Sequence, residues 1–90
     1  AALLMLGRLL VADGRDAEAS EAYRRAIVHD SFLEQAHREL MRCYARQGER
    51  GKALRHYQGL VELLDAELGA QPAPETTALC TRLRQGDALI

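Results

Sequence analysis

Apolar residues recur along the chain at spacings of three and four, which is the period of one face of an α-helix. Short polar or glycine-containing stretches separate the apolar segments. Gly14, Gly48 and Gly69 follow three of these segments, where a helix commonly ends in a left-handed residue. The pattern predicts helices over about residues 2–13, 16–29, 31–47, 50–68 and 74–85.

The sequence also contains an internal repeat with a period of about 34 residues. A shift of 34 positions places Gly48 on Gly14, Ala53 on Ala19, Tyr57 on Tyr23 and Val61 on Ile27. In both copies an alanine precedes a tyrosine by one helical turn on the same face, as close packing of antiparallel helices requires. Tetratricopeptide arrays repeat a helix-turn-helix unit of about this length. We therefore expect an all-α fold, a tetratricopeptide-like α-α superhelix.

A single domain is expected to occupy the whole chain, residues 1–90. Repeat one spans about residues 1–30 and repeat two about residues 31–68, each as a helical hairpin. The helix over about residues 74–85 begins with a proline, which suits the first helical position. We expect it to act as a capping helix on the open end of repeat two, because solenoids need such a cap.

Local signals give three further expectations for side chains near the helix ends and within the longest helix. Asp16 is placed to cap the second helix. Ser31 and Glu34 have the spacing of a capping box at the start of the third. Gly59 lies inside the fourth helix, where a glycine often marks a close backbone approach, here by the C-terminal segment.

Composition and charge argue against several functions. A net charge of −1 provides no overall field to hold nucleic acid. None of His29, His37 and His56 has a metal-ligand partner three or four residues later, and Cys43 and Cys80 have no metal-binding spacing. We expect His37 to be a hydrogen-bonded core histidine and the cysteines to be buried thiols. No metal, cofactor or catalytic set is expected, and no segment has the roughly 18 apolar residues of a membrane span.

Three groups of residues carry a resemblance to a known family. They are Glu34, His37, Leu40 and Met41; then Ala53, Leu54 and Tyr57; then Leu64, Glu67, Leu68, Gly69 and Pro72. Together they resemble the bacterial transcriptional activator domain, in its C-terminal part. The chain departs from the family pattern at Ser31, where a proline is usual, and at Ala73, where a capping Ser or Asp is usual.

The resemblance implies a role in regulation and no reaction. Such domains follow a winged-helix DNA-binding domain in activators of the antibiotic-regulatory type, and they also occur in larger regulators. They serve oligomerisation and contacts with the DNA-binding domain or the transcription machinery. The implied chain is a cytoplasmic, non-catalytic fragment of a longer protein, which meets DNA only through other domains of that protein.

An arginine stripe is the first candidate interaction site. Arg38, Arg42 and Arg46 are four residues apart, so they share one helix face, and the repeat places Arg8 beside Arg42. On the concave side of a tetratricopeptide array these guanidinium groups would grip an acidic partner segment. A charge run on a helix is more often a solvated face, with Glu34 pairing with Arg38, and this is the interpretation that we prefer.

The first predicted helix supplies the second candidate site, a self-association surface. Leu3, Leu6 and Leu10 form its expected inner stripe, and Leu4, Met5, Leu9 and Val11 are apolar as well. A helix that is apolar all round is buried all round. We expect these four residues to be covered by an upstream part of a longer protein or by a second copy in a symmetric dimer. The alternative is an exposed surface that has no biological meaning and results from truncation.

Two other classes of function remain open. One is a generic peptide-binding tetratricopeptide scaffold that clamps a C-terminal carboxylate with lysine and asparagine. The chain has no asparagine, and its one lysine, Lys52, lies off the concave face. The other is an accessory domain of a signalling enzyme, which the sequence does not separate from a regulator domain. The upstream gene sequence would distinguish these classes.

Overall fold

The computed structural model describes residues 2–86 and contains five α-helices and no strand within them. The helices are α1 (Ala2–Ala12), α2 (Asp16–His29), α3 (Glu34–Arg46), α4 (Arg50–Leu68) and α5 (Pro74–Arg84). The predicted all-α fold is confirmed. Residue 1 and residues 87–90 of the expected domain lie outside the described part.

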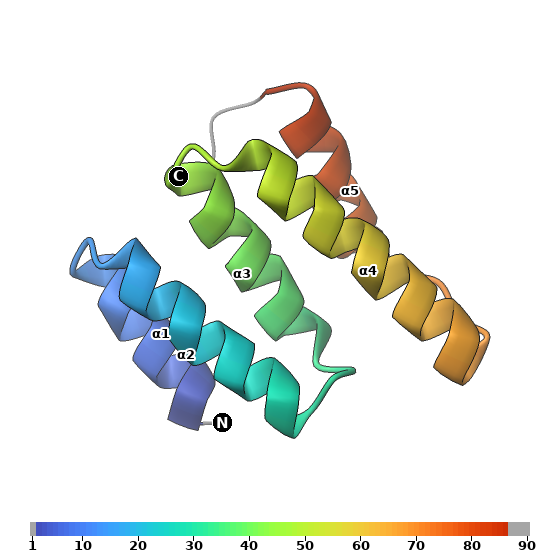
Figure 1. Cartoon of the computed structure of the whole chain (residues 1–90), viewed down its shortest axis with the longest axis horizontal. Helices are drawn as coiled ribbons and strands as arrows, with labels where there is room; N and C mark the ends of the chain where they lie inside the picture. Colours follow the sequence, from blue (N-terminus) through green and yellow to red (C-terminus); the bar gives the residue numbers. More distant parts are fainter. Residues whose placement is uncertain (1, 87–90) are drawn as a thin grey trace.

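The helices are arranged as two antiparallel hairpins and one further helix (Figure 1). α1 packs against α2, α2 packs against α3, and α3 packs against α4. α5 lies against both α3 and α4, so it closes the second hairpin, as expected of a capping helix. The described chain is a flattened body of 37 × 31 × 18 Å.

The two hairpin turns have the same backbone geometry, one repeat apart. Gly14 and Gly48 both have a φ of 77°, in the left-handed region that a residue with a Cβ atom enters only under strain. After each glycine the next amide donates back to the helix, Arg15 N to Leu10 O and Glu49 N to Tyr44 O, both at 2.8 Å. These bonds satisfy carbonyl groups that the helix end leaves free.

The core is centred on α3, where Ala36, Leu40, Met41 and Cys43 have no exposed surface. α2 contributes Tyr23 to this core and α5 contributes its own buried stripe, Leu79, Cys80 and Leu83. The Tyr23 ring packs directly on Gly7 of α1, and a Cβ atom at Gly7 would overlap the ring. The glycine that permits close packing of two helices is therefore Gly7, between α1 and α2.

The rotation of α1 about its axis differs from the prediction. Leu6 was expected on the inner stripe but is 44% exposed, whereas Leu4 is buried beside Gly7. The cause is the contact between Gly7 and Tyr23, which turns the Gly7 side of α1 toward α2. Because α1 is apolar on every side, its sequence gives no clear signal for this rotation.

The three local expectations at the helices are wrong in their details. Neither Asp16 nor Ser31 makes a side-chain cap; α2 is preceded by Arg15 and α3 by Leu33, without a capping hydrogen bond. A Cβ atom added at Gly59 would meet nothing within 4 Å, so no segment packs closely there. Asp16 instead accepts a hydrogen bond from Arg46 Nε at 3.0 Å.

Candidate interaction site

Arginine residues from three helices line a groove on one side of the molecule. The groove is a cavity of about 420 Å³ lined by Arg8 and Val11 of α1, Tyr23 of α2, Glu39, Arg42 and Arg46 of α3, and Arg82 of α5. Arg8 and Arg42 occupy equivalent repeat positions, so the stacking of hairpins brings α1 and α3 together here. We call this cavity the arginine groove.

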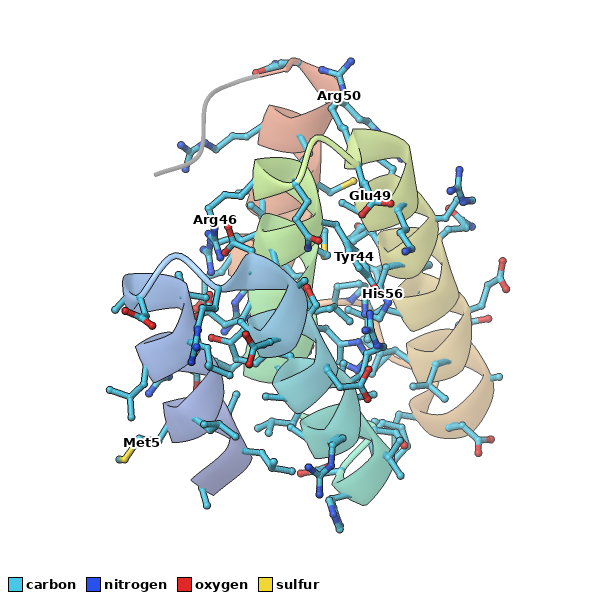
Figure 2. All side chains as sticks on the ribbon, turned by 60° about the vertical axis from the view of Figure 1, so that its left-hand side comes forward. Met5, Tyr44, Arg46, Glu49, Arg50 and His56 are labelled. Carbon is cyan, nitrogen blue, oxygen red and sulfur yellow. The ribbon has the colours of Figure 1, made fainter. Side chains whose placement is uncertain are left out.

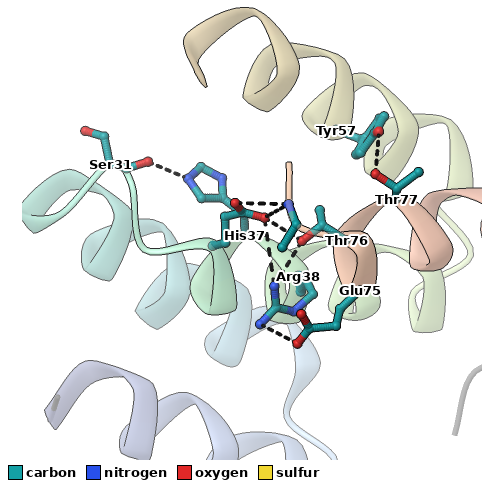
Figure 3. Close-up of polar contacts among 9 residues, drawn as sticks. Ser31, His37, Arg38, Tyr57, Glu75, Thr76 and Thr77 are labelled. Atoms are coloured by element: carbon teal, nitrogen blue, oxygen red, sulfur yellow. Dashed lines mark hydrogen bonds and ion pairs between the residues drawn. The ribbon is translucent and has the colours of Figure 1, made fainter. Parts of the chain in front are cut away.

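Arg38 does not belong to the arginine groove, although the sequence analysis grouped it with Arg42 and Arg46. Its Nη1 donates to Thr76 Oγ1 at 2.9 Å, and its guanidinium lies 3.9 Å from the carboxylates of Glu34 and Glu75 (Figure 3). The expected pairing of Glu34 with Arg38 is therefore present. Arg38 serves to attach α5 to α3.

This attachment, the α3–α5 latch, is built around the Glu34 carboxylate. It accepts hydrogen bonds from the Ala73 amide at 2.9 Å and from the Thr76 hydroxyl at 2.7 Å. Thr76 is completely buried, so both bonds of its hydroxyl, to Glu34 and from Arg38, form away from water. Glu34 was predicted to reach Ser31, but α5 offers it better placed donors.

The arginines of the groove differ in their ion pairs. Arg42 pairs with Glu39 at 2.6 Å, and Arg46 pairs with Asp16 at 3.0 Å. Within residues 2–86, neither Arg8 nor Arg82 has a carboxylate within 4.0 Å. The groove therefore combines two neutralised guanidinium groups with two that are not neutralised by the described part of the chain.

Tyr23 forms part of the groove wall and is only 1% exposed. Burial, together with the nearby Glu39 carboxylate, raises the pKa of Tyr23 to about 12, so its hydroxyl remains protonated at neutral pH. Within residues 2–86 this hydroxyl has no hydrogen-bond partner, and it reaches the solvent in the groove. It is a neutral donor placed among guanidinium groups.

The expected self-association surface is only partly exposed. Met5 and Leu9 are each 63% exposed, and Met5 points outward from α1 (Figure 2). Leu4 is 6% exposed, so its assignment to this surface is wrong; the helix rotation described above places it in the core. Val11 is half-buried and lines the arginine groove. With Leu6 added, Met5, Leu6 and Leu9 form an apolar strip, and we keep that name for it.

A histidine pair between α3 and α4 was not found from the sequence. His37 Nδ1 lies 2.8 Å from His56 Nε2, and Tyr44 packs edge-on to the His56 ring (Figure 2). His37 is a buried, hydrogen-bonded histidine, as predicted. The two histidines are 19 residues apart, so no spacing rule for one helix links them.

The surroundings of the histidine pair and the two cysteines in the fold bear on whether they can act as metal ligands or reactive groups. Among residues 2–86, no three side chains of His, Cys, Asp or Glu are grouped to hold a metal ion. Cys43 and Cys80 are buried free thiols, and burial raises the pKa of both, which disfavours the reactive thiolate. In the same part of the chain, no helix combines the length and the apolar character needed to cross a bilayer.

The fold and its surfaces define the class of protein: an all-helical, tetratricopeptide-like repeat domain with a charged groove and an exposed apolar strip. A comparison with protein families makes the assignment specific. The family model of the bacterial transcriptional activator domain matches residues 1–84. The chain belongs to this family. Neither the curated proteins nor the solved structures contain a match to the chain.

Proposed function

We propose that the chain is a non-catalytic protein-interaction and oligomerisation domain of a bacterial transcriptional regulator. Its partners are a second copy of itself, the DNA-binding domain of the same regulator, or the transcription machinery. DNA is contacted by other domains of the regulator, and the protein acts in the cytoplasm. Membership of the activator-domain family supports the regulatory setting.

The apolar strip on α1 is the observation that carries the interaction role. Met5, Leu6 and Leu9 expose 63%, 44% and 63% of their surface on adjacent turns of one helix. The repeat places Leu6 on Leu40 and Leu9 on Cys43, and both of these α3 residues are fully buried. The strip is therefore the α1 counterpart of a face that is covered in α3. Such a face supports docking of a further helix.

The number of apolar side chains in the strip indicates how strong the contact between two copies can be. Full burial of an apolar side chain contributes about 1.5–3 kcal/mol. Association costs at least about 4 kcal/mol before any contact is counted. Three side chains on each copy therefore support a dimer of weak to moderate affinity. A two-fold dimer covers the strip of each copy with the same surface of the other.

Light scattering over a concentration series tests the proposal. The wild-type chain is expected to change from monomer to dimer in the micromolar range. The variant Met5→Glu plus Leu9→Glu should remain a monomer, because it places like charges across the two-fold axis. A matched control is Val28→Glu plus Leu68→Glu, at exposed apolar positions outside the strip. A wild-type monomer at high micromolar concentration, or a dimer that survives the α1 substitutions, would contradict self-association through the strip.

A further inference from the structure

We propose that the arginine groove binds an acidic peptide segment of a partner protein, with its carboxylate groups held by Arg8, Arg82 and the Tyr23 hydroxyl. This inference rests on the proposed interaction role and specifies a second surface for it. Arg82 and Tyr23 were not singled out in the sequence stripe. The groove is separate from the apolar strip, whose exposed side chains Met5 and Leu9 do not line it.

The charges of the groove favour an anion. Four guanidinium groups and one carboxylate line it, and the one carboxylate, Glu39, is engaged by Arg42. Arg8 of α1 and Arg82 of α5 both line the groove, and neither has a described carboxylate in ion-pair range. An arginine offers a planar fork of donors that matches a carboxylate in two parallel hydrogen bonds. A ligand carboxylate would occupy donors that the described chain leaves available.

Tyr23 adds a neutral polar donor to the groove. Its side chain is almost fully buried, but its hydroxyl reaches the solvent in the groove and makes no hydrogen bond to residues 2–86. With the pKa of Tyr23 at about 12, the hydroxyl is a neutral donor. A carboxylate oxygen in the groove would provide its acceptor.

The backbone around the groove favours carboxylates over phosphate. Phosphate sites commonly use the free amide groups of a helix N-terminus. The groove residues instead belong to the middle and last turns of α1, α2, α3 and α5, where amide groups are used within the helix. Recognition therefore depends on side-chain donors. The groove is lined by side chains from α1, α2, α3 and α5, and its four guanidinium groups can bind more than one carboxylate of a peptide segment.

Glu39 competes with such a ligand for Arg42. Its carboxylate is 2.6 Å from the Arg42 guanidinium and lines the same cavity. Replacing Glu39 with glutamine removes one negative charge from the groove and releases Arg42. We expect Glu39→Gln to bind an acidic peptide about three-fold or more tightly than wild type. A tighter complex is a result that a merely destabilised protein does not give.

Fluorescence anisotropy with a fluorescein-labelled peptide tests the proposal. The probe is an eight-residue peptide of alternating glutamate and serine, and the reference peptide has glutamine in place of glutamate. Titrations are made at about 0.15 M salt, where long-range attraction between exposed charges is largely screened. We expect the glutamate peptide to bind and the glutamine peptide not to bind.

Two double variants locate the binding site. Arg8→Gln plus Arg82→Gln should weaken peptide binding at least about ten-fold, because two charge-assisted contacts are lost. The matched control, Arg25→Gln plus Arg55→Gln, removes the same charge at exposed positions outside the groove and should change binding by less than two-fold. Equal weakening in both variants, or wild-type binding in the groove variant, would overturn the proposal. Circular dichroism establishes that both variants are folded.

Competition with inorganic pyrophosphate separates carboxylate from phosphate recognition. Displacement of the peptide only at high pyrophosphate concentration agrees with a peptide groove. If pyrophosphate displaces the labelled peptide at a lower concentration than the unlabelled glutamate peptide does, the peptide proposal is overturned in favour of a phosphate site. Peptide binding is also measured in a Met5→Gln plus Leu9→Gln variant, which adds no charge. Its peptide affinity should equal that of wild type, so a failed dimer and a failed groove give different results.

Discussion

His37 Nδ1 and His56 Nε2 lie 2.8 Å apart and join α3 to α4 by a hydrogen bond between two imidazole rings. His37 Nε2 also lies 2.8 Å from the Ser31 carbonyl oxygen, which only accepts. His37 therefore donates through Nε2 and accepts at Nδ1, and His56 donates through Nε2. In this arrangement both imidazole rings are neutral, and His37 Nδ1, His37 Nε2 and His56 Nε2 each have a hydrogen-bond partner.

The histidine pair predicts a stability that falls in acid. Burial lowers the pKa of His37; burial, the neighbouring His37 and Arg24 together lower the pKa of His56 to about 4. The unfolded chain, with histidine near pKa 6.5, then binds more protons than the folded chain between about pH 6.5 and 4. Stability is fully present above about pH 6.5 and is lost as the pH falls through this window. Urea midpoints measured from pH 7.5 to 4.5 should show the decline.

A His56→Gln variant should show a smaller decline over the same pH range, because one of the two titrating groups is gone. His29→Gln is the matched control, since His29 is exposed at the end of α2. An unchanged pH profile for His56→Gln, or an equal effect of His29→Gln, would show that the acid sensitivity has another origin.

Alanine at two helical glycines should have opposite effects. At Gly7 the added methyl group would overlap the buried Tyr23 ring. Overpacking of this kind costs about 1–3 kcal/mol, which outweighs a helix-propensity gain of up to about 1 kcal/mol. At Gly59 the methyl group meets nothing within 4 Å, so Gly59→Ala should stabilise by up to about that propensity gain. Thermal unfolding of the two variants in parallel gives the comparison, and a stabilised Gly7→Ala would refute the described packing of α1.

The α3–α5 latch predicts a large difference between two neighbouring threonines. Thr76→Val removes a buried hydroxyl that donates to Glu34 and accepts from Arg38, and should cost about 1–3 kcal/mol. Thr77→Val removes an exposed hydroxyl 3.4 Å from the Tyr57 hydroxyl and should cost less than about 0.5 kcal/mol. Both changes place the same β-branched side chain in α5. Urea unfolding that ranks them equally would exclude the latch as the main attachment of α5.

The chain alone should not bind duplex DNA with sequence preference. Its net charge is −1, and its arginine groove is formed between packed helices. A DNA-binding domain commonly has a basic patch or stripe and a high isoelectric point, whereas this chain is close to neutral. A gel-shift titration at moderate salt should give no sequence-dependent complex. Sub-micromolar binding that distinguishes two duplexes would contradict the assignment of DNA contacts to other domains.

The backbone plan could be predicted because its signals are local. Gly14 and Gly48 each follow an apolar helical segment, and glycine adopts the left-handed geometry of a helix end without Cβ strain. The Ala19–Tyr23 spacing likewise identifies a packed face, and both residues are buried. These features need only the sequence within one helical turn. Five helices follow from such signals, and the expected limits of α4 agree with the observed Arg50–Leu68.

Features between helices could not be predicted in the same way. The His37–His56 pair and the Glu34–Thr76 bond join residues 19 and 42 positions apart, so they depend on how whole helices pack. The predicted capping box at Ser31 does not form, because the Glu34 carboxylate accepts hydrogen bonds from Ala73 and Thr76 instead. Arg82 enters the groove only through the placement of α5 on α3. These contacts between helices therefore depend on tertiary packing, which no local signal in the sequence reports.

The order in which the helices pack has a consequence for local unfolding. α3 is held by α2, α4 and α5, whereas α1 packs mainly against α2. In a chain whose units contact only their neighbours, a terminal unit opens without the rest. The amide hydrogens of α1 should therefore exchange with solvent ahead of those of α3. α1 also carries the apolar strip and Arg8, so a partner bound at either surface should slow the exchange of the α1 amide hydrogens.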